Sequence, residues 1–316
     1  MKPFAFVFPG QGSQSVGMLD AWGDHPAVLE TLKEASDALG EDLGQLIKTG
    51  PKEILALTSN TQPVMLAAGV ATYRAWIAET GAAPAAVAGH SLGEYSALVA
   101  AGVLTLAQAT PLVRLRAQAM QEAVPVGTGA MAAILGLDSA KVIAGCAEVT
   151  AGYASGAGEV VEAVNFNDPA QTVIAGSKAA VEKACEALKA AGAKRALPLP
   201  VSAPFHSSLM RPAAEALRER LRSVDLAAPR IALINNIDVA VESDPQRIRD
   251  ALFRQAFGPV RWVECIQAIK QRGMTTIVEC GPGKVLAGMV KRIDAELTGL
   301  AIYDPATLAE VKGQLL

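Results

Sequence analysis

The chain has 316 residues, of which 51% are hydrophobic and 19% are charged, and its formal net charge is −3 at pH 7. This length and apolar content suit two domains, or one large domain that contains an insertion. The basic residues are scattered, which argues against nucleic-acid binding, and no apolar run approaches the roughly 20 residues that a membrane-spanning helix needs.

The cysteines and the amino-terminal segment favour a protein of a reducing compartment. The four cysteines lie far apart and form no C-x-x-C pair, so we expect neither a disulfide framework nor a zinc or other metal site. Free thiols are typical of cytosolic proteins. The apolar stretch before Pro9 is too short for the apolar region of a signal peptide. We therefore expect a cytoplasmic protein that does not associate with a membrane.

In the first part of the chain, strands alternate with helices. Residues 4–8 are predicted to form a buried strand that ends in a Pro-Gly-Gln-Gly turn. Helical patterns follow, and the clearest covers residues 63–79. Residues 85–90 are predicted to form a short strand and residues 92–101 a helix. Ser91 therefore lies where a strand is followed by a helix.

The middle of the chain shows a different order of elements. The order is strand, helix, strand, strand, helix and strand, over residues 130–137, 138–149, 160–165, 172–176, 177–191 and 195–199. This βαββαβ order is that of the ferredoxin-like unit. We expect residues 128–200 to form a smaller ferredoxin-like subdomain, in which residues 151–158 are a flexible loop.

After residue 200 the alternation of helices and strands resumes. Predicted helices cover residues 207–224, 245–257, 261–271 and 284–297, and predicted strands cover residues 231–235 and 275–279. Such alternation indicates a mostly parallel sheet. The expected fold class is α/β, with a larger α/β-hydrolase-like domain of residues 1–127 and 201–316 and the inserted ferredoxin-like subdomain.

Residues 89–93, with the sequence GHSLG, match a turn that exposes a nucleophilic serine. A sharp turn between a strand and a helix leaves no room for bulk, which explains the glycines on both sides of Ser91. The backbone N–H of Leu92, near a helix N-terminus, would face an oxyanion formed at this serine. A serine that only caps the helix is the structural alternative. The position between strand and helix favours the nucleophile.

A nucleophilic serine needs a base, and the chain has three histidines. His90 should point away from its neighbour Ser91, because side chains on an extended strand alternate between faces. His25 lies in a polar stretch typical of a surface turn. His206 precedes a predicted helix, whose N-terminus disfavours a charged imidazole and keeps the ring available as a base. We predict that His206 is the base, and a surface histidine that caps the helix is the alternative.

No carboxylate is identified as a third member of a catalytic triad. Asp138 and Asp168 lie between Ser91 and His206 in the sequence, as an α/β-hydrolase would require. Both fit structural roles better, the first as a helix cap and the second before a turn proline. An amide or a backbone carbonyl can orient the histidine instead.

Arg116 lies in the middle of the apolar face of a predicted helix over residues 112–123, whereas Arg114 lies on the opposite, polar face. An arginine in apolar surroundings is costly unless an anion pairs with it. Its partner is either a substrate carboxylate, held by both guanidinium N–H groups, or an internal carboxylate such as Glu94. The helical pattern alone does not separate these alternatives.

Two glycine-rich turns do not match nucleotide-binding patterns. Residues 10–15 (GQGSQS) follow the first strand but lack the last glycine of G-x-G-x-x-G, and the chain contains no G-K-[ST]. A backbone N–H in this turn is a candidate donor to an oxyanion. Residues 281–284 (GPGK) fit a strand-to-helix turn.

Seven segments together resemble the malonyl-CoA:acyl carrier protein transacylases of fatty acid synthesis and the acyltransferase domains of polyketide synthases. The resemblance runs nearly from end to end, and the segments follow the order of the family. They are FPGQGSQ at 8–14, GHSLGEYSALVAAG at 89–102, VRLRAQAMQEAVPVGTGAM at 113–131, VNFNDPAQTVIAG at 164–176, PVSAPFHSSLM at 200–210, FGPVRW at 257–262 and ECGPGKVL at 279–286.

The resemblance implies a ping-pong transfer of a malonyl group from malonyl-CoA to acyl carrier protein, in fatty acid or polyketide synthesis, with no permanently bound cofactor. It implies that Ser91 carries the malonyl ester and that His206 accepts the serine proton. Gln11 and Leu92 would donate backbone N–H groups to the oxyanion, and Arg116 would bind the malonyl carboxylate.

The resemblance also implies that an amide-bearing residue late in the chain, Gln255, orients the histidine. An aromatic residue before that histidine, here Phe205, favours malonyl over methylmalonyl. The carrier protein is expected to be acidic, so Lys284, Lys291 and Arg292 on one predicted helix form a candidate docking surface. A solvated helix face is the alternative for these three residues. We expect a monomer.

Two other classes of function share the same serine turn. A serine esterase or thioesterase predicts a carboxylate near His206 and release of free acid. A non-catalytic docking module for a carrier protein predicts that Ser91 is only a cap. Neither class needs an anion-binding arginine, so Arg116 counts against both.

Overall fold

The computed structural model describes residues 2–154, 158–201 and 203–316. Its larger part is built on a five-stranded sheet in the order β7-β2-β1-β8-β9, in which each neighbouring pair is parallel. The strands are β1 (Phe4–Phe8), β2 (Ala86–Gly89), β7 (Ala232–Ile234), β8 (Thr276–Cys280) and β9 (Thr298–Ile302). Phe8 at the end of β1 pairs with Gly89 at the end of β2, so the segments after the two strands begin side by side.

The central strand β1 is buried on both faces, because successive side chains enter different cores. Phe4, Phe6 and Phe8 pack into a first apolar core, whereas Ala5 and Val7 pack into a second one. The first core takes in α1 (Pro26–Leu39), α2 (Leu43–Thr49), α3 (Lys52–Leu55), α4 (Thr58–Thr80), α5 (Gly93–Ala100), α6 (Leu106–Glu122), α9 (Arg211–Arg222), α10 (Pro245–Gln255), α13 (Pro305–Leu315) and the 3-10 turns Asp20–Trp22 and Ser208–Met210. The second takes in α11 (Trp262–Gln271) and α12 (Val285–Ile293).

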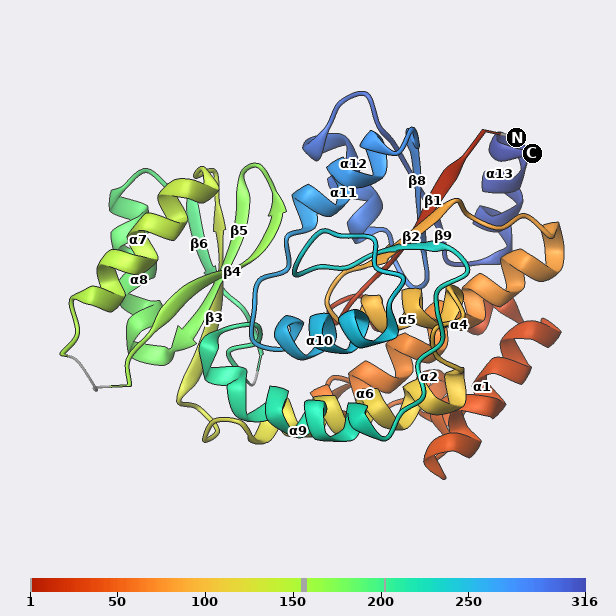
Figure 1. The fold of residues 1–316 in the computed structure, drawn as a ribbon, viewed down its shortest axis with the longest axis horizontal. Coiled ribbons are helices and arrows are strands. Elements are labelled where there is room, and N and C mark those ends of the chain that lie inside the picture. The colour runs from red at the N-terminus through yellow and green to blue at the C-terminus, as the bar shows by residue number, and fades with distance from the viewer. Residues whose placement is uncertain (1, 155–157, 202) are drawn as a thin grey trace.

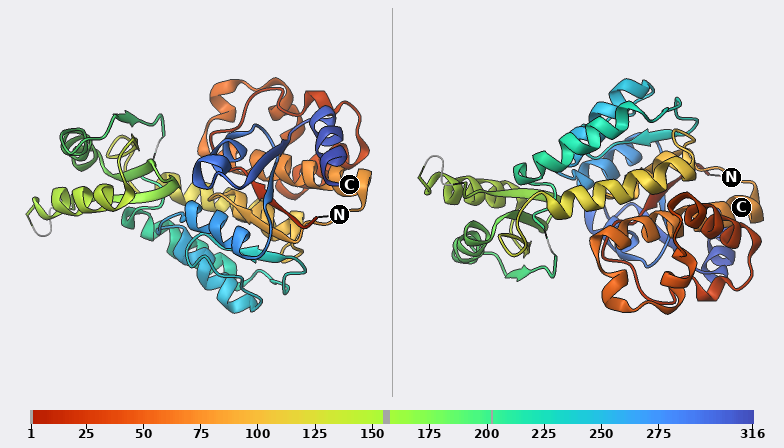
Figure 2. Two further views of the ribbon diagram at one scale, coloured as in Figure 1. Left: turned by 90° about the horizontal axis from the view of Figure 1, so that it is seen from above. Right: turned by 90° about the horizontal axis from the view of Figure 1, so that it is seen from below.

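The smaller part is a four-stranded antiparallel sheet in the order β4-β5-β3-β6, with its own apolar core against two helices. Its elements are β3 (Gly129–Leu135), α7 (Ser139–Ala151), β4 (Val161–Asp168), β5 (Gln171–Ser177), α8 (Lys178–Ala190) and β6 (Arg195–Pro198). Figures 1 and 2 show this part at one end of the molecule, opposite the end where the two chain termini lie close together. Residues 155–157, within the loop expected over residues 151–158, lie outside the described residues.

The edge strand β4 contacts the larger part through its backbone. Val260, which lies between α10 and α11, donates from its N–H to the carbonyl of Val164 at 2.8 Å and accepts at its carbonyl from the N–H of Phe166 at 3.0 Å. Arg292 of α12 forms an ion pair with the buried Asp168 at 2.8 Å. His90, directly after β2, also contacts Asn167 of β4 at 2.8 Å, so the two parts meet on the side of the sheet where β2 ends.

Most predicted elements overlap with those of the structure, and the differences lie at their ends. The predicted helix over residues 63–79 begins earlier, at Thr58, so Pro63 lies inside the helix instead of at its start. The helix predicted from residue 284 to about residue 297 is present but shorter, since α12 ends at Ile293, and the chain then adds β9, which was not predicted, to the sheet edge. β9 is only partly buried, so it has no strong apolar signal. Among the described residues, no helix is long and apolar enough to cross a membrane.

Candidate active site

Ser91 lies in a tight turn between β2 and α5. Its φ is 53°, in the left-handed region that non-glycine residues rarely adopt. A Cβ atom on Gly89 would lie 1.9 Å from the carbonyl carbon of Gly93, and a Cβ atom on Gly93 would lie 2.1 Å from the carbonyl oxygen of Phe8. The backbone therefore approaches itself so closely that only glycine fits on either side of the serine.

His206 faces the hydroxyl of Ser91. The serine Oγ lies 2.6 Å from His206 Nε2, and His206 Nδ1 lies 2.9 Å from the carbonyl oxygen of Gln255 and 3.2 Å from that of Gly258. A carbonyl only accepts, so Nδ1 carries the proton and Nε2 is free to accept the proton of the serine. Burial, and then the positive charge of Arg116, lower the pKa of His206 to about 3. The imidazole is thus a neutral base at physiological pH.

Gln255 reaches this histidine in a different way from the one expected. The structure places its main-chain carbonyl, not its side-chain amide, on His206 Nδ1. Gln255 is the last residue of α10, and the last carbonyls of a helix have no partner within it. The side-chain amide instead donates from Nε2 to the carbonyl of Ser91 at 2.9 Å and accepts at Oε1 from Arg116 Nη2 at 3.1 Å.

Arg116 reaches the site from α6 and is only 2% exposed. Its Nη1 donates to Gln62 Oε1 at 2.8 Å, and its Nη2 lies 3.3 Å from Ser91 Oγ. Among the described residues, no carboxylate forms an ion pair with it, and its Nε has no hydrogen-bond partner. Glu94, considered above as its internal partner, instead accepts hydrogen bonds from other groups. Burial lowers the pKa of Arg116, so the site holds a desolvated cation that faces the nucleophile.

Gln11 and Leu92 line the same pocket as Ser91, His206 and Arg116. The pairing of β1 with β2 brings Gln11, three residues after β1, to the serine turn. Within the part of the chain that the structure describes, neither Gln11 nor Leu92 uses its backbone N–H in a hydrogen bond. Both N–H groups can therefore donate to an oxygen that develops negative charge beside the serine.

Sequence reasoning missed Asn236, which follows β7. Its Oδ1 accepts from the N–H of Ser91 at 2.8 Å, and its Nδ2 donates to the carbonyl of Gly89 at 2.8 Å. Its own N–H donates to Glu94 Oε2 at 2.9 Å. The signal available was a pair of asparagines, Asn235 and Asn236, directly after a strand of a parallel sheet, since ligand sites gather at the carboxyl ends of such strands. Gln62, which contacts Arg116, carried no comparable signal.

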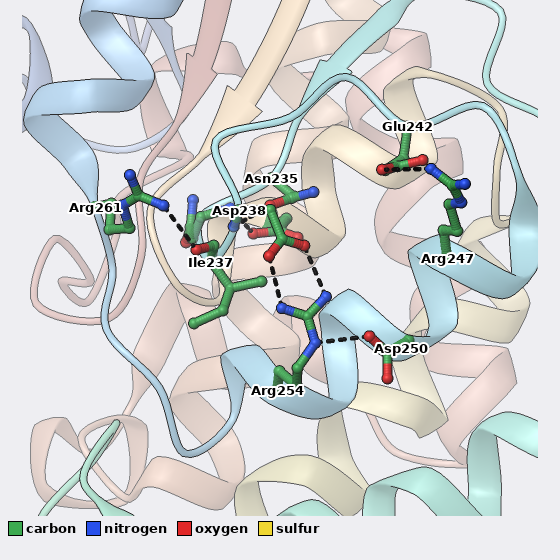
Figure 3. Close-up of polar contacts among 10 residues, drawn as sticks. Asn235, Ile237, Asp238, Glu242, Arg247, Asp250, Arg254 and Arg261 are labelled. Atoms are coloured by element: carbon green, nitrogen blue, oxygen red, sulfur yellow. Dashed lines mark hydrogen bonds and ion pairs between the residues drawn. The ribbon is translucent and has the colours of Figure 1, made fainter.

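An ion pair outside the pocket joins the segment of Asn236 to α10 (Figure 3). Arg254 donates to both carboxylate oxygens of Asp238, at 2.6 and 2.7 Å, and its Nε donates to Asp250 at 2.6 Å. Asn235 Oδ1 accepts from the N–H of Asp238 at 2.7 Å. The hydrogen bonds from Arg254 lower the pKa of Asp238. Asn236, two residues before Asp238, and Gln255, directly after Arg254, both contact Ser91.

The remaining candidate residues lie around the pocket. Phe205 lines it, as does His90, whose Nε2 is 2.8 Å from Asn167 Oδ1 rather than at the serine. Lys284 and Lys291 are exposed at the two ends of α12, whereas Arg292 is held by Asp168. No group of three or more His, Cys, Asp or Glu side chains among the described residues could hold a metal ion.

Comparison with known proteins shows the family of the chain. The chain matches the acyl transferase domain family over residues 5–302. The malonyl CoA-acyl carrier protein transacylase of Escherichia coli strain K12 is 53% identical over 310 residues, which are 98% of each chain. The protein of the same name from Bacillus subtilis strain 168 is 44% identical, over 98% of this chain and 96% of its own.

Solved structures give the same result. The acyl-carrier-protein S-malonyltransferase of Burkholderia pseudomallei superimposes with a TM-score of 0.95 at 66% identity, over 98% of this chain and 99% of its own. A malonyl-transacylase solved in complex with a type II PKS acyl-carrier protein has a TM-score of 0.95 at 50% identity, over 99% of this chain and 100% of its own. The chain therefore belongs to the acyl transferase domain family and, within it, to the malonyl-CoA:acyl carrier protein transacylases.

Proposed function

We propose that the protein transfers a malonyl group from malonyl-CoA to the phosphopantetheine thiol of an acyl carrier protein through an ester on Ser91. The observation that carries the proposal is Arg116, a buried guanidinium 3.3 Å from the nucleophile that has no ion-pair partner among the described residues. A substrate carboxylate would supply that partner. The names of the relatives point to the same substrate and acceptor.

In the first half-reaction, the Oγ of Ser91 attacks the thioester carbonyl while its proton passes to Nε2 of His206. The N–H groups of Gln11 and Leu92 stabilise the oxyanion of the tetrahedral intermediate. The intermediate collapses to the serine ester, the C–S bond breaks, and the CoA sulfur leaves with the proton from the histidine. Throughout this step Arg116 holds the malonyl carboxylate.

The second half-reaction reverses these roles. The thiol of the carrier protein gives its proton to His206 and attacks the malonyl ester. The C–O bond to Ser91 breaks, and the serine oxygen takes the proton back from the histidine. The chain therefore needs no bound cofactor, and malonyl-CoA acts as a substrate.

The same geometry supports selectivity for malonyl groups. An acetyl group has no carboxylate, so it would leave the buried Arg116 without an anion. Phe205 lines the pocket and limits the room for the extra methyl group of methylmalonyl.

The test is the mass of the intact protein after incubation with malonyl-CoA. We expect a malonyl adduct on the wild type and none on S91A, and an R116A variant should lose malonyl transfer far more than acetyl transfer. An adduct that persists in S91A would refute the mechanism. Equal losses of the two activities in R116A would remove the role of the arginine.

An esterase that uses the same turn is less well supported. Such an enzyme was expected to place a carboxylate beside the histidine, whereas the partners of His206 Nδ1 are two main-chain carbonyls. The malonyl ester should therefore persist on Ser91 until a thiol acceptor arrives.

The proposal also covers the domain organisation of the chain, its cellular location, its oligomeric state and its docking surface. The strand order β4-β5-β3-β6 with α7 and α8 supports a ferredoxin-like subdomain of residues 128–200 inserted into an α/β-hydrolase-like domain of residues 1–127 and 201–316. The four free cysteines support a cytoplasmic location, away from membranes and nucleic acid. The protein acts as a monomer, and the exposed Lys284 and Lys291 contribute to the docking of an acidic carrier protein.

A further inference from the structure

The side chain of Gln255 forms a bridge between two buried charged groups. Its Oε1 accepts from Arg116 Nη2 at 3.1 Å, and its Nε2 donates to Glu94 Oε2 at 3.1 Å. All three side chains are no more than 2% exposed. A guanidinium only donates and a carboxylate only accepts, so the two neighbours determine which end of the amide points to which. The cation and the anion thus interact through the amide rather than in direct contact.

The same oxygen of Glu94 also binds Asn236, the second residue that contacts the serine turn. Glu94 Oε2 accepts from the N–H of Asn236 at 2.9 Å. Asn236 binds the N–H of Ser91, and Gln255 binds the carbonyl of Ser91. One buried carboxylate therefore fixes the two side chains that hold both backbone groups of the nucleophile.

We propose that Glu94 is a positioning residue, whose carboxylate aligns Ser91 through Asn236 and Gln255 and holds Arg116 through the Gln255 amide in the pose that receives the substrate carboxylate. This inference rests on the proposed function. It assigns Glu94 no contact with the substrate. Its effect should be larger for malonyl than for acetyl groups, because only the malonyl carboxylate uses Arg116.

A role in stability alone explains the arrangement less well. Glu94 lies in the first turn of α5, where a negative charge is favourable. That benefit amounts to at most about 2 kcal/mol, however, and Glu94 is 1% exposed. A buried carboxylate is costly unless its hydrogen bonds offset the loss of water. Its two donors are the residues that hold the nucleophile.

The charge of Glu94 should matter in an accessible range of pH. Burial raises its pKa to about 7, although the hydrogen bonds from its donors and the charge of Arg116 oppose that rise. The negative charge of Asp238, in the segment after β7, adds to the rise. Tyr95 of α5 and Cys265 of α11 also lie near it, and burial raises the pKa of each well above neutrality, so neither changes charge in this range. Glu94 is thus the group among these neighbours that ionises near pH 7.

The experiment compares E94Q and E94A with the wild type and with E279Q. Glu279 is the matched control, because it is also a fully buried carboxylate whose pKa burial raises to about 7, and it accepts from the N–H of Ala287 in α12 instead of contacting the site. The rate of malonyl loading onto Ser91 is measured in a single turnover between about pH 5.5 and about pH 8.5, a window that spans both ionisation states of Glu94.

At the alkaline end we expect E94Q, which keeps the acceptor but not the charge, to load malonyl about 10-fold more slowly than the wild type, and E94A about 100-fold more slowly. At the acidic end, protonation of Glu94 makes the wild type resemble E94Q, so their rates should converge. The preference for malonyl over acetyl should shrink in E94Q, and E279Q should match the wild type at each pH.

An E94Q-to-wild-type ratio that stays constant with pH, or an equal loss in E279Q, would overturn the inference. If E94A does not fold, as judged by circular dichroism, E94Q alone decides. A wild type that forms no malonyl adduct would refute the proposed function together with the inference. A wild type that loads malonyl no faster than E94Q at any pH would refute the inference alone.

Discussion

The turn at residues 89–93 and the segment that carries Asn236 and Gln255 hold the same serine by different means. In the turn, consecutive residues impose the geometry, because the backbone passes too close to itself for any side chain at Gly89 or Gly93. Asn236 and Gln255 reach Ser91 across 145 and 164 positions of sequence. Local crowding therefore shapes the nucleophile turn, whereas long-range hydrogen bonds fix its orientation.

The largest expected effect comes from G93A, which disrupts the backbone turn at residues 89–93. The added Cβ would lie 2.1 Å from the carbonyl oxygen of Phe8, a clash with backbone that no side-chain motion can relieve. We expect a loss of more than about 4 kcal/mol in the free energy of unfolding, measured with urea, and no acyl-enzyme. In the control G288A, the new Cβ of this α12 residue would meet no atom within 4 Å, so its stability should be unchanged or higher by about 1 kcal/mol or less. Equal stabilities for the two variants would contradict the local account.

The next effect in size comes from removing a long-range contact with N236A. This variant leaves the N–H of Ser91 and the carbonyl of Gly89 without their partner. Each buried, unpaired polar group costs about 1–3 kcal/mol, and the serine should also lose its alignment. We expect a fall of kcat by about 100-fold with little change in the KM for malonyl-CoA, measured by transfer to carrier protein. A variant that loses substrate affinity but keeps its turnover rate would show that Asn236 acts on binding instead.

This contrast also explains what the sequence predicted and what it did not. The parallel sheet, the separate antiparallel part and the serine turn follow from apolar periodicity and from glycines at fixed positions. Ser91, His206 and Arg116 stood out because nucleophiles, bases and buried cations are few, and the structure brings them together.

The long-range contacts left no such pattern. Glu94 and Asn236 are 142 positions apart, and neither spacing nor periodicity relates them. The role of Gln255 depended on where one helix ends. The predicted helix ran to residue 257, whereas α10 ends at Gln255, and this small difference decides which carbonyls remain free for His206. The helices and strands around the site were predicted, but the residues at which they end were not, and this limited the prediction of the site.

A smaller effect concerns the pH dependence of stability on the histidine side of the serine. The pKa of His206 is about 3 in the folded protein, against an ordinary value of 6.5. Below about pH 6.5 this histidine therefore binds a proton in the unfolded chain but not in the folded protein. Its contribution to the free energy of unfolding is thus lost progressively as the pH falls towards 3. At pH 5 the wild type should have lost about 2 kcal/mol from this group. H206Q, which cannot protonate there, should gain about that much relative to the wild type between pH 7 and pH 5. The free energy of unfolding is measured with urea for both proteins at pH 7 and pH 5. An equal change between the two pH values in both proteins would contradict this assignment.

The smallest expected effect comes from the ion pair of Asp238 with Arg254, which lies outside the pocket next to the segments that carry Asn236 and Gln255. Asp238 and Arg254 are each 36% exposed, so solvent screens their attraction, and pairs of this kind contribute about 1 kcal/mol or less to stability. Their position gives them more influence on rate than on stability, since Asp238 follows Asn236 by two residues and Arg254 directly precedes Gln255. We expect D238A and R254A to slow malonyl loading a few-fold each, and the double variant to be no slower than R254A alone, because R254A already breaks the ion pair with Asp238 as well as the contact with Asp250. The more exposed pair of Lys33 with Asp37 on α1, at 75% and 64% exposure, provides a control far from the site, and D37A should load malonyl at the wild-type rate. Multiplicative losses in the double variant would mean that the two residues act on the serine independently, and that the segment after β7 and the end of α10 do not move as a unit.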